Sequence, residues 1–124
     1  MNDALLFFDR SPAALPLYEA LTERLLAQCP DTAIRVQKTQ ITFVHRHVYA
    51  CASLQRVRRK AELPDPYLVV TLGLPGPLDS PRAAAQSEPY PGRWTVHIVL
   101  GSPEDADDEL LTWLRQAYDF AARK

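Results

Sequence analysis

The stretch 93–118 constrains the fold of this chain most, because it predicts a strand, a tight turn and a long helix in succession. Alternation along 94–100 places large apolar side chains on one face of the strand. They are Trp94, Val96, Ile98 and Leu100. A helix is expected to begin at Ser102-Pro103, because serine is a favoured N-cap and proline suits the first helical position. Apolar residues then recur at helical spacing, so this helix should lie on a sheet.

The rest of the chain predicts one more long helix and several strands. An amphipathic helix runs from Leu15 to Cys29 and ends before Pro30. Strand patterns cover 34–38, 41–45, 48–54 and 67–74, the second and third forming a hairpin. We therefore expect a single α+β domain over residues 1–124. It should be a two-layer sandwich with an antiparallel sheet of four or five strands and the N- and C-terminal helices on one face.

Residues 75–92 lack a strand pattern and are predicted to form a long loop. They hold five of the 11 prolines, and Ser80 is placed to cap a helical turn over the alanines that follow. Loops of this length in compact domains are either functional or disordered. The aromatic and cationic end of the segment favours a loop folded against the sheet, and whether it covers the open sheet face is left undecided.

Composition excludes several classes of function. The net charge of −1 argues against nonspecific nucleic-acid binding, which requires a basic excess. The longest apolar run, 4–8, is too short to cross a bilayer, and no signal-peptide pattern occurs, so a cytoplasmic location without membrane contact is expected. Two cysteines without C-x-x-C spacing, Cys29 and Cys51, favour reduced thiols over a disulfide.

The candidate binding site lies on the sheet face opposite the helices. Strand alternation places His97 there, together with Tyr49, Cys51 and Ser53. We expect cationic and aromatic residues to line this face and its rim and to bind a small anionic ligand or a peptide. The ligand-binding candidates are Lys38, Tyr67, Arg82, Tyr90, Arg93 and His97. The alternative is that the 75–92 loop covers the face and His97 is a hydrogen-bonded structural residue.

Other candidate chemistry is weaker. His45 and His47 form only half of a metal site, and no third ligand has diagnostic spacing, so no metal is predicted. Cys51 with His97 is the one pair whose inferred faces permit nucleophilic catalysis. No nucleophile or phosphate-loop motif occurs, so neither catalytic residues nor a cofactor are predicted. A basic run over 56–60 could contact phosphate, although a solvated strand end is the preferred interpretation.

Several short motifs resemble one family of uncharacterised proteins. These are K-T-Q at 38–40, P-R at 81–82, E-P-Y at 88–90, R-W-T-V-H at 93–97 and W-L-x-x-A-Y at 113–118. The chain resembles over nearly its whole length a domain-of-unknown-function family of small α+β proteins, sometimes labelled "predicted transport protein". The resemblance implies a fold but no established activity. The transport label has no physical support in a chain without a membrane segment.

Three hypotheses for function follow from the sequence. The first is a noncatalytic binding module whose open sheet face takes a small anionic ligand or a peptide. The second is an interaction domain that forms a homodimer through the same face. The third is an enzyme that uses Cys51 or His97.

Overall fold

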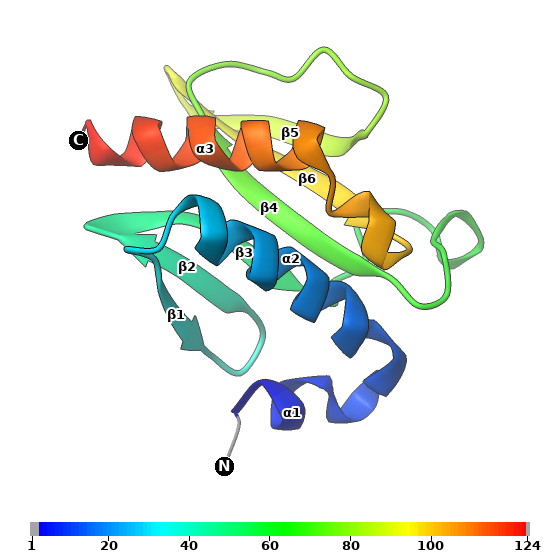
Figure 1. The fold of residues 1–124 in the computed structure, drawn as a ribbon. Helices are drawn as coiled ribbons and strands as arrows, with labels where there is room; N and C mark the ends of the chain where they lie inside the picture. The colour runs from blue at the N-terminus through cyan, green and yellow to red at the C-terminus, as the bar shows by residue number, and fades with distance from the viewer. Residues whose placement is uncertain (1–2, 124) are drawn as a thin grey trace.

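The computed structural model describes residues 3–123, which form three α-helices, six strands and short 3-10 turns (Figure 1). The helices are α1 (Asp3–Phe7), α2 (Leu15–Gln28) and α3 (Asp108–Ala122). The strands are β1 (Ala33–Val36), β2 (Ile41–His45), β3 (His47–Ser53), β4 (Leu68–Leu74), β5 (Ala83–Tyr90) and β6 (Arg93–Leu100).

The six strands form one open antiparallel sheet in the order β1-β2-β3-β4-β6-β5. The α+β class is therefore as predicted, whereas the expected number of strands, four or five, is one or two too low. The long strands β4 and β6 pair over their whole length at the centre, from Leu68 opposite Leu100 to Leu74 opposite Trp94. Continuous apolar runs and period-two alternation made these two strands easy to recognise.

The additional strand, β5, lies in the segment expected to be a loop. Ser80 does cap a turn, since its hydroxyl accepts the N–H of Arg82, but the chain then becomes extended instead of helical. β5 is an edge strand with an irregular register, and its residues from Gln86 onward are exposed. Alanine, glutamine and serine are poor strand formers, and an exposed edge strand has no buried face to impose an alternating pattern. Pro89 is tolerated there because an edge strand need not donate every N–H.

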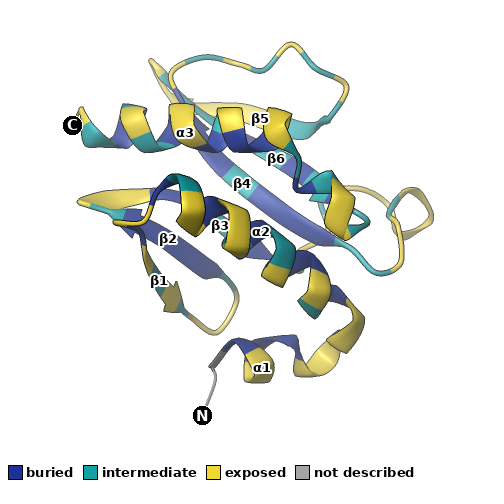
Figure 2. Cartoon of the chain, viewed as in Figure 1, coloured by how far each residue is buried: buried dark blue, intermediate teal, exposed yellow. Residues whose placement is uncertain are grey.

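α2 and α3 lie side by side across the same face of the sheet (Figure 1). Figure 2 shows the buried residues concentrated where these helices meet the strands. The core is one hydrophobic cluster. It includes Phe43, Val70, Val96, Ile98, Leu100, Leu110 and Leu114. The sequence showed only an apolar segment at the N-terminus; Phe7 at the end of α1 and Phe8 in the 3-10 turn that follows both join that cluster.

The start of the last helix differs from the prediction. Ser102 precedes only a 3-10 turn at Pro103–Asp105, and α3 begins at Asp108 with Asp107 as its N-cap. The Asp107 carboxylate accepts the N–H of Leu110 at 3.0 Å. Asp105 instead accepts the N–H groups of Gly101 and Ser102, which closes the turn after β6. Ser102, Pro103 and Asp105 form the capping pattern of a helix start, but here it begins a 3-10 turn, which explains why the sequence predicted the helix too early.

A bulge in the hairpin corrects one predicted side-chain direction. The β2–β3 register shifts between Phe43 and Val44, so one residue of β3 is inserted and the alternation breaks. Tyr49 consequently points to the helix side, where its hydroxyl hydrogen-bonds Thr32 at 2.7 Å and its ring meets Tyr118 edge-on. It was expected on the open face with Cys51.

Candidate functional site

A row of polar residues crosses the open face of the sheet at its centre. The strand register aligns Arg35, Thr42, Cys51, Thr71 and His97 on five neighbouring strands. None of the three helices packs over this row, because α2 and α3 lie on the other face (Figure 1). This row of the open face is therefore polar, whereas the helices and the hydrophobic core lie on the other side of the sheet.

His97 is held in one orientation by its neighbours. Its Nδ1 lies 2.8 Å from the Thr71 hydroxyl and 3.4 Å from the Gln55 amide nitrogen. Both contacts are satisfied when Nδ1 accepts and the ring proton is on Nε2. Burial lowers the pKa of His97, in agreement with a neutral ring. His97 thus presents an N–H donor at Nε2 and is not a cation at neutral pH.

Cys51 and His97 do not form a nucleophile and base pair. β4 separates their strands, and Thr71 occupies the position between them. Two strand spacings amount to roughly 10 Å, which exceeds hydrogen-bond reach. Burial also raises the pKa of the Cys51 thiol, so the reactive thiolate is disfavoured. The geometry gives no support to the Cys/His enzyme hypothesis.

Arg93 lies at the other end of the same face, against the backbone of β4. A Cβ atom added to Gly73 would lie 2.9 Å from one guanidinium nitrogen of Arg93, so the guanidinium occupies the space that the missing side chain leaves. Within residues 3–123 no carboxylate pairs with it. A small hollow of about 70 Å³ adjoins the two residues. Its lining is completed by Val48, Tyr49, Ala50, Cys51, Thr71, Leu72 and Thr95.

Arg82, by contrast, is fully engaged in holding β5 to the start of α3. Its guanidinium donates to Asp107 at 2.9 Å, to Glu109 at 3.0 Å and to the carbonyl of Asp105 at 2.9 Å. It also lies 5.6 Å from the ring centroid of Trp113. Although burial lowers it, the pKa of Arg82 is raised overall by the hydrogen bonds to the two carboxylates. This arginine is a structural latch, because its charge is already compensated.

The other predicted ligand-binding residues lie apart from Arg93 and His97. Lys38 is in the turn between β1 and β2, near the opposite edge of the sheet. Tyr90 ends β5 and is 53% exposed. Tyr67 precedes β4, and its hydroxyl donates to the carbonyl of Leu54 at 2.6 Å. The six candidates therefore do not surround one cavity, and only Arg93 and His97 share the open face.

The sequence interpretation missed what partly covers this face. The 75–92 segment extends the sheet at its edge, and the segment between β3 and β4 crosses the face instead. Gln55 reaches His97, and Arg58 and Pro64 share a pocket with Val99. Gly73 was also overlooked, although an isolated glycine within an apolar strand is a known sign of close approach by another group.

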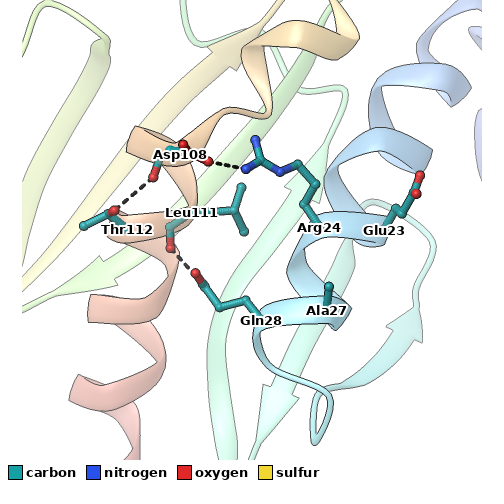
Figure 3. A pocket seen from close by; sticks show the side chains of 7 residues that line it. All are labelled: Glu23, Arg24, Ala27, Gln28, Asp108, Leu111 and Thr112. Atoms are coloured by element: carbon teal, nitrogen blue, oxygen red, sulfur yellow. Dashed lines mark hydrogen bonds and ion pairs between the residues drawn. The ribbon is translucent and has the colours of Figure 1, made fainter.

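A groove of about 550 Å³ lies between α2 and α3 (Figure 3). Its walls are joined by contacts between the helices. Arg24 pairs with Asp108, and the Gln28 amide donates to the carbonyl of Leu111 at 2.8 Å. These side chains point toward each other across the groove (Figure 3), so the polar groups there serve helix packing.

Residues 3–123 show neither a metal-binding cluster nor a membrane-spanning helix. They contain no group of three or more histidine, cysteine or acidic residues placed to hold a metal ion, and His45 instead stacks on Tyr118 with ring centroids 4.6 Å apart. No helix in that range has the length and apolar character needed to cross a membrane. Both cysteines are free.

Comparison with known proteins places the chain in a family. Neither a curated protein nor a solved structure shows significant similarity to it. One family model matches residues 6–121, nearly the whole chain, and confirms the resemblance found in the sequence. The protein belongs to the family described as "Domain of unknown function (DUF5655)".

Proposed function

We propose that this domain is a noncatalytic binding module whose open sheet face takes the carboxylate or phosphate group of a small ligand or a peptide. The observation that carries the proposal is the Arg93 guanidinium, half-buried on a polar face without a carboxylate partner. Arginine that is partly withdrawn from water gains most from a charge-assisted hydrogen bond to an oxyanion. Arg82 differs from Arg93 because Asp107 and Glu109 already compensate its charge.

The hollow beside Arg93 fits an anionic group and not a whole metabolite. Its volume of about 70 Å³ corresponds to roughly two water molecules at about 30 Å³ each. Thr95 supplies a hydroxyl donor at its edge. His97 follows Thr95 by two residues on β6, so the two residues lie on the same face with their backbones roughly 7 Å apart. The rest of the ligand would extend over the open face.

A titration of the pure protein with phosphate and with acetate tests the proposal. We expect saturable amide shifts at Thr95 and Gly73 in NMR spectra, lost in Arg93→Gln and kept in the control Arg123→Gln on the helix side. A bound anion favours the imidazolium, so it should raise the pKa of His97, and binding should weaken as pH rises. A His97 pKa that stays lowered and does not respond to phosphate would contradict the proposal.

Gly73→Ala provides an independent variant of the same site. The new methyl group meets only the far end of the flexible Arg93 side chain, so stability should change by less than about 1 kcal/mol. The guanidinium must nevertheless move off β4. We expect anion binding to weaken severalfold in a protein that melts normally, and full binding in this variant would show that the position of Arg93 is irrelevant.

Self-association through the open face is the second candidate. Val48 is 45% exposed and lines the same hollow, so a second copy could bury it. Light scattering separates the two functions. A concentration-dependent dimer that Val48→Asp abolishes would favour the interface, whereas a monomer at all concentrations leaves the face free for a ligand.

A further inference from the structure

The segment between β3 and β4 carries more positive charge than its own carboxylates compensate. It holds Arg56, Arg58, Arg59 and Lys60 against Glu62 and Asp65. Arg59 pairs with Glu62 at 3.2 Å. No carboxylate of the described chain pairs with the other three cations. This uncompensated charge sits in a protein whose overall net charge is −1.

Two of these cations face a pocket that also has an aromatic wall. The pocket measures about 480 Å³ and is lined by Arg56, Lys60, Leu63, Pro64, Asp65 and Tyr67. The hydrogen bond from the Tyr67 hydroxyl to Leu54 fixes the phenol ring in place. Tyr67 also borders a second hollow with Arg10 and Ser11, so its ring stands between two openings. The pocket beside Arg56 and Lys60 shares no lining residue with the hollow beside Arg93.

We propose that this pocket binds a phosphate ester of an aromatic base, of the size of a nucleoside monophosphate. Arg56 and Lys60 contact the phosphate, and the base packs on Tyr67 and the apolar wall. Fixed tyrosine rings are favourable stacking surfaces for bases. The volume lies within the usual range for small-molecule sites, about 300–1,000 Å³. Asp65, the one carboxylate of the lining, accepts a donor of the base or sugar.

The charge distribution favours a small ligand over a nucleic-acid strand. A strand gains affinity from many phosphate contacts along an extended basic surface. Here the basic residues lie within one short segment, and Arg82 beyond it is already paired with Asp107 and Glu109. One phosphate between Arg56 and Lys60 matches the charge that is available.

Calorimetry and NMR with adenosine monophosphate, adenosine and inorganic phosphate test this inference. We expect the monophosphate to bind most tightly and to shift the Tyr67 ring resonances. The double variant Arg56→Gln, Lys60→Gln should weaken its binding about tenfold or more through lost phosphate contacts. Tyr67→Leu should weaken it about tenfold through lost stacking. Arg123→Gln, a charge change on the helix side, should leave it unchanged.

Each alternative result overturns a stated part of the proposal. Equal affinity for adenosine and its monophosphate would remove the phosphate site. Equal affinity for phosphate and the monophosphate, with no effect of Tyr67→Leu, would remove the base site. Absence of saturable binding in the wild-type protein would remove both. If Tyr67→Leu unfolds, the double charge variant and Tyr67→Phe, which keeps the ring, still decide the outcome.

Discussion

The N-cap of α3 offers a direct test of how this chain begins its last helix. Asp107 accepts the N–H of Leu110 and pairs with Arg82 at 2.9 Å, so one carboxylate caps α3 and anchors β5. Ser102, which the sequence singled out, closes only a 3-10 turn. Replacing each residue with alanine should therefore give different losses of stability.

The magnitudes follow from the contacts that each substitution removes. Losing an aspartate cap costs about 1 kcal/mol. The ion pair adds at most about 1 kcal/mol, because the Asp107 side chain is 46% exposed and solvent screens the pair. Asp107→Ala should thus lower the free energy of unfolding by about 1–2 kcal/mol. Ser102→Ala should cost roughly 0.5 kcal/mol or less, the lower limit for a cap.

Urea denaturation followed by circular dichroism measures both losses, and Asp107→Asn separates their causes. Asparagine caps as well as aspartate but cannot pair with Arg82, so it should recover about half of the loss. Burial raises the Asp107 pKa, yet the Arg82 and Leu110 hydrogen bonds lower it overall. The ionised group therefore contributes stability above its unfolded pKa of about 3.9, and this is lost as pH falls through the lower folded pKa. Equal losses for Ser102→Ala and Asp107→Ala would refute the assignment of the cap.

Three further predictions concern the core and the open face. Leu114→Ala should lower the free energy of unfolding by about 2–5 kcal/mol because Leu114 is completely buried. The control Thr112→Ala, at an exposed position of the same helix, should lower it by less than about 1 kcal/mol. Similar urea midpoints for the two variants would contradict this prediction. Tyr49→Phe should cost about 1–3 kcal/mol because it leaves the buried Thr32 hydroxyl unpaired, and Thr32→Val in that background should cost little more. Without added anion, the pKa of His97 measured by NMR should lie below its reference value of about 6.5. The contribution of the neutral ring to the free energy of unfolding should therefore be complete above that value and be lost as pH falls through the lower folded pKa. His97→Gln should remove this pH dependence.

Elements with a buried face could be predicted from the sequence because burial imposes a period. The alternation of 94–100 and the apolar run of 67–74 identified β6 and β4, and α2 ends where Pro30 required. β5 could not be recognised in the same way. β5 pairs with β6 on one side only, and its residues from Gln86 onward are exposed. Their residue types suit contact with water and therefore do not show the pattern of a strand.

The candidate site was predicted less well because its geometry depends on long-range placement. Strand alternation correctly put Cys51 and His97 on one face, but alternation does not reveal a bulge, and one inserted residue turned Tyr49 to the other face. Arg82 was grouped with the ligand residues because its carboxylate partners lie 25 and 27 positions later in the chain. Pairings at such separations leave no local pattern.

Arginines that pair with a carboxylate stabilise this fold, whereas arginines without a carboxylate partner keep a charge that is available to a ligand. Arg24, Arg82 and Arg115 each pair with a carboxylate of α3, so the acidic residues of that helix neutralise the cations of the helix side and of the β5 latch. Within residues 3–123, neither Arg93 nor Arg56 pairs with a carboxylate. Other arginines of the described chain, among them Arg46 and Arg123, also lack a carboxylate partner. Arg93, Arg56 and Lys60 differ from these two because each lines a hollow, and that is where we expect an anionic ligand to bind.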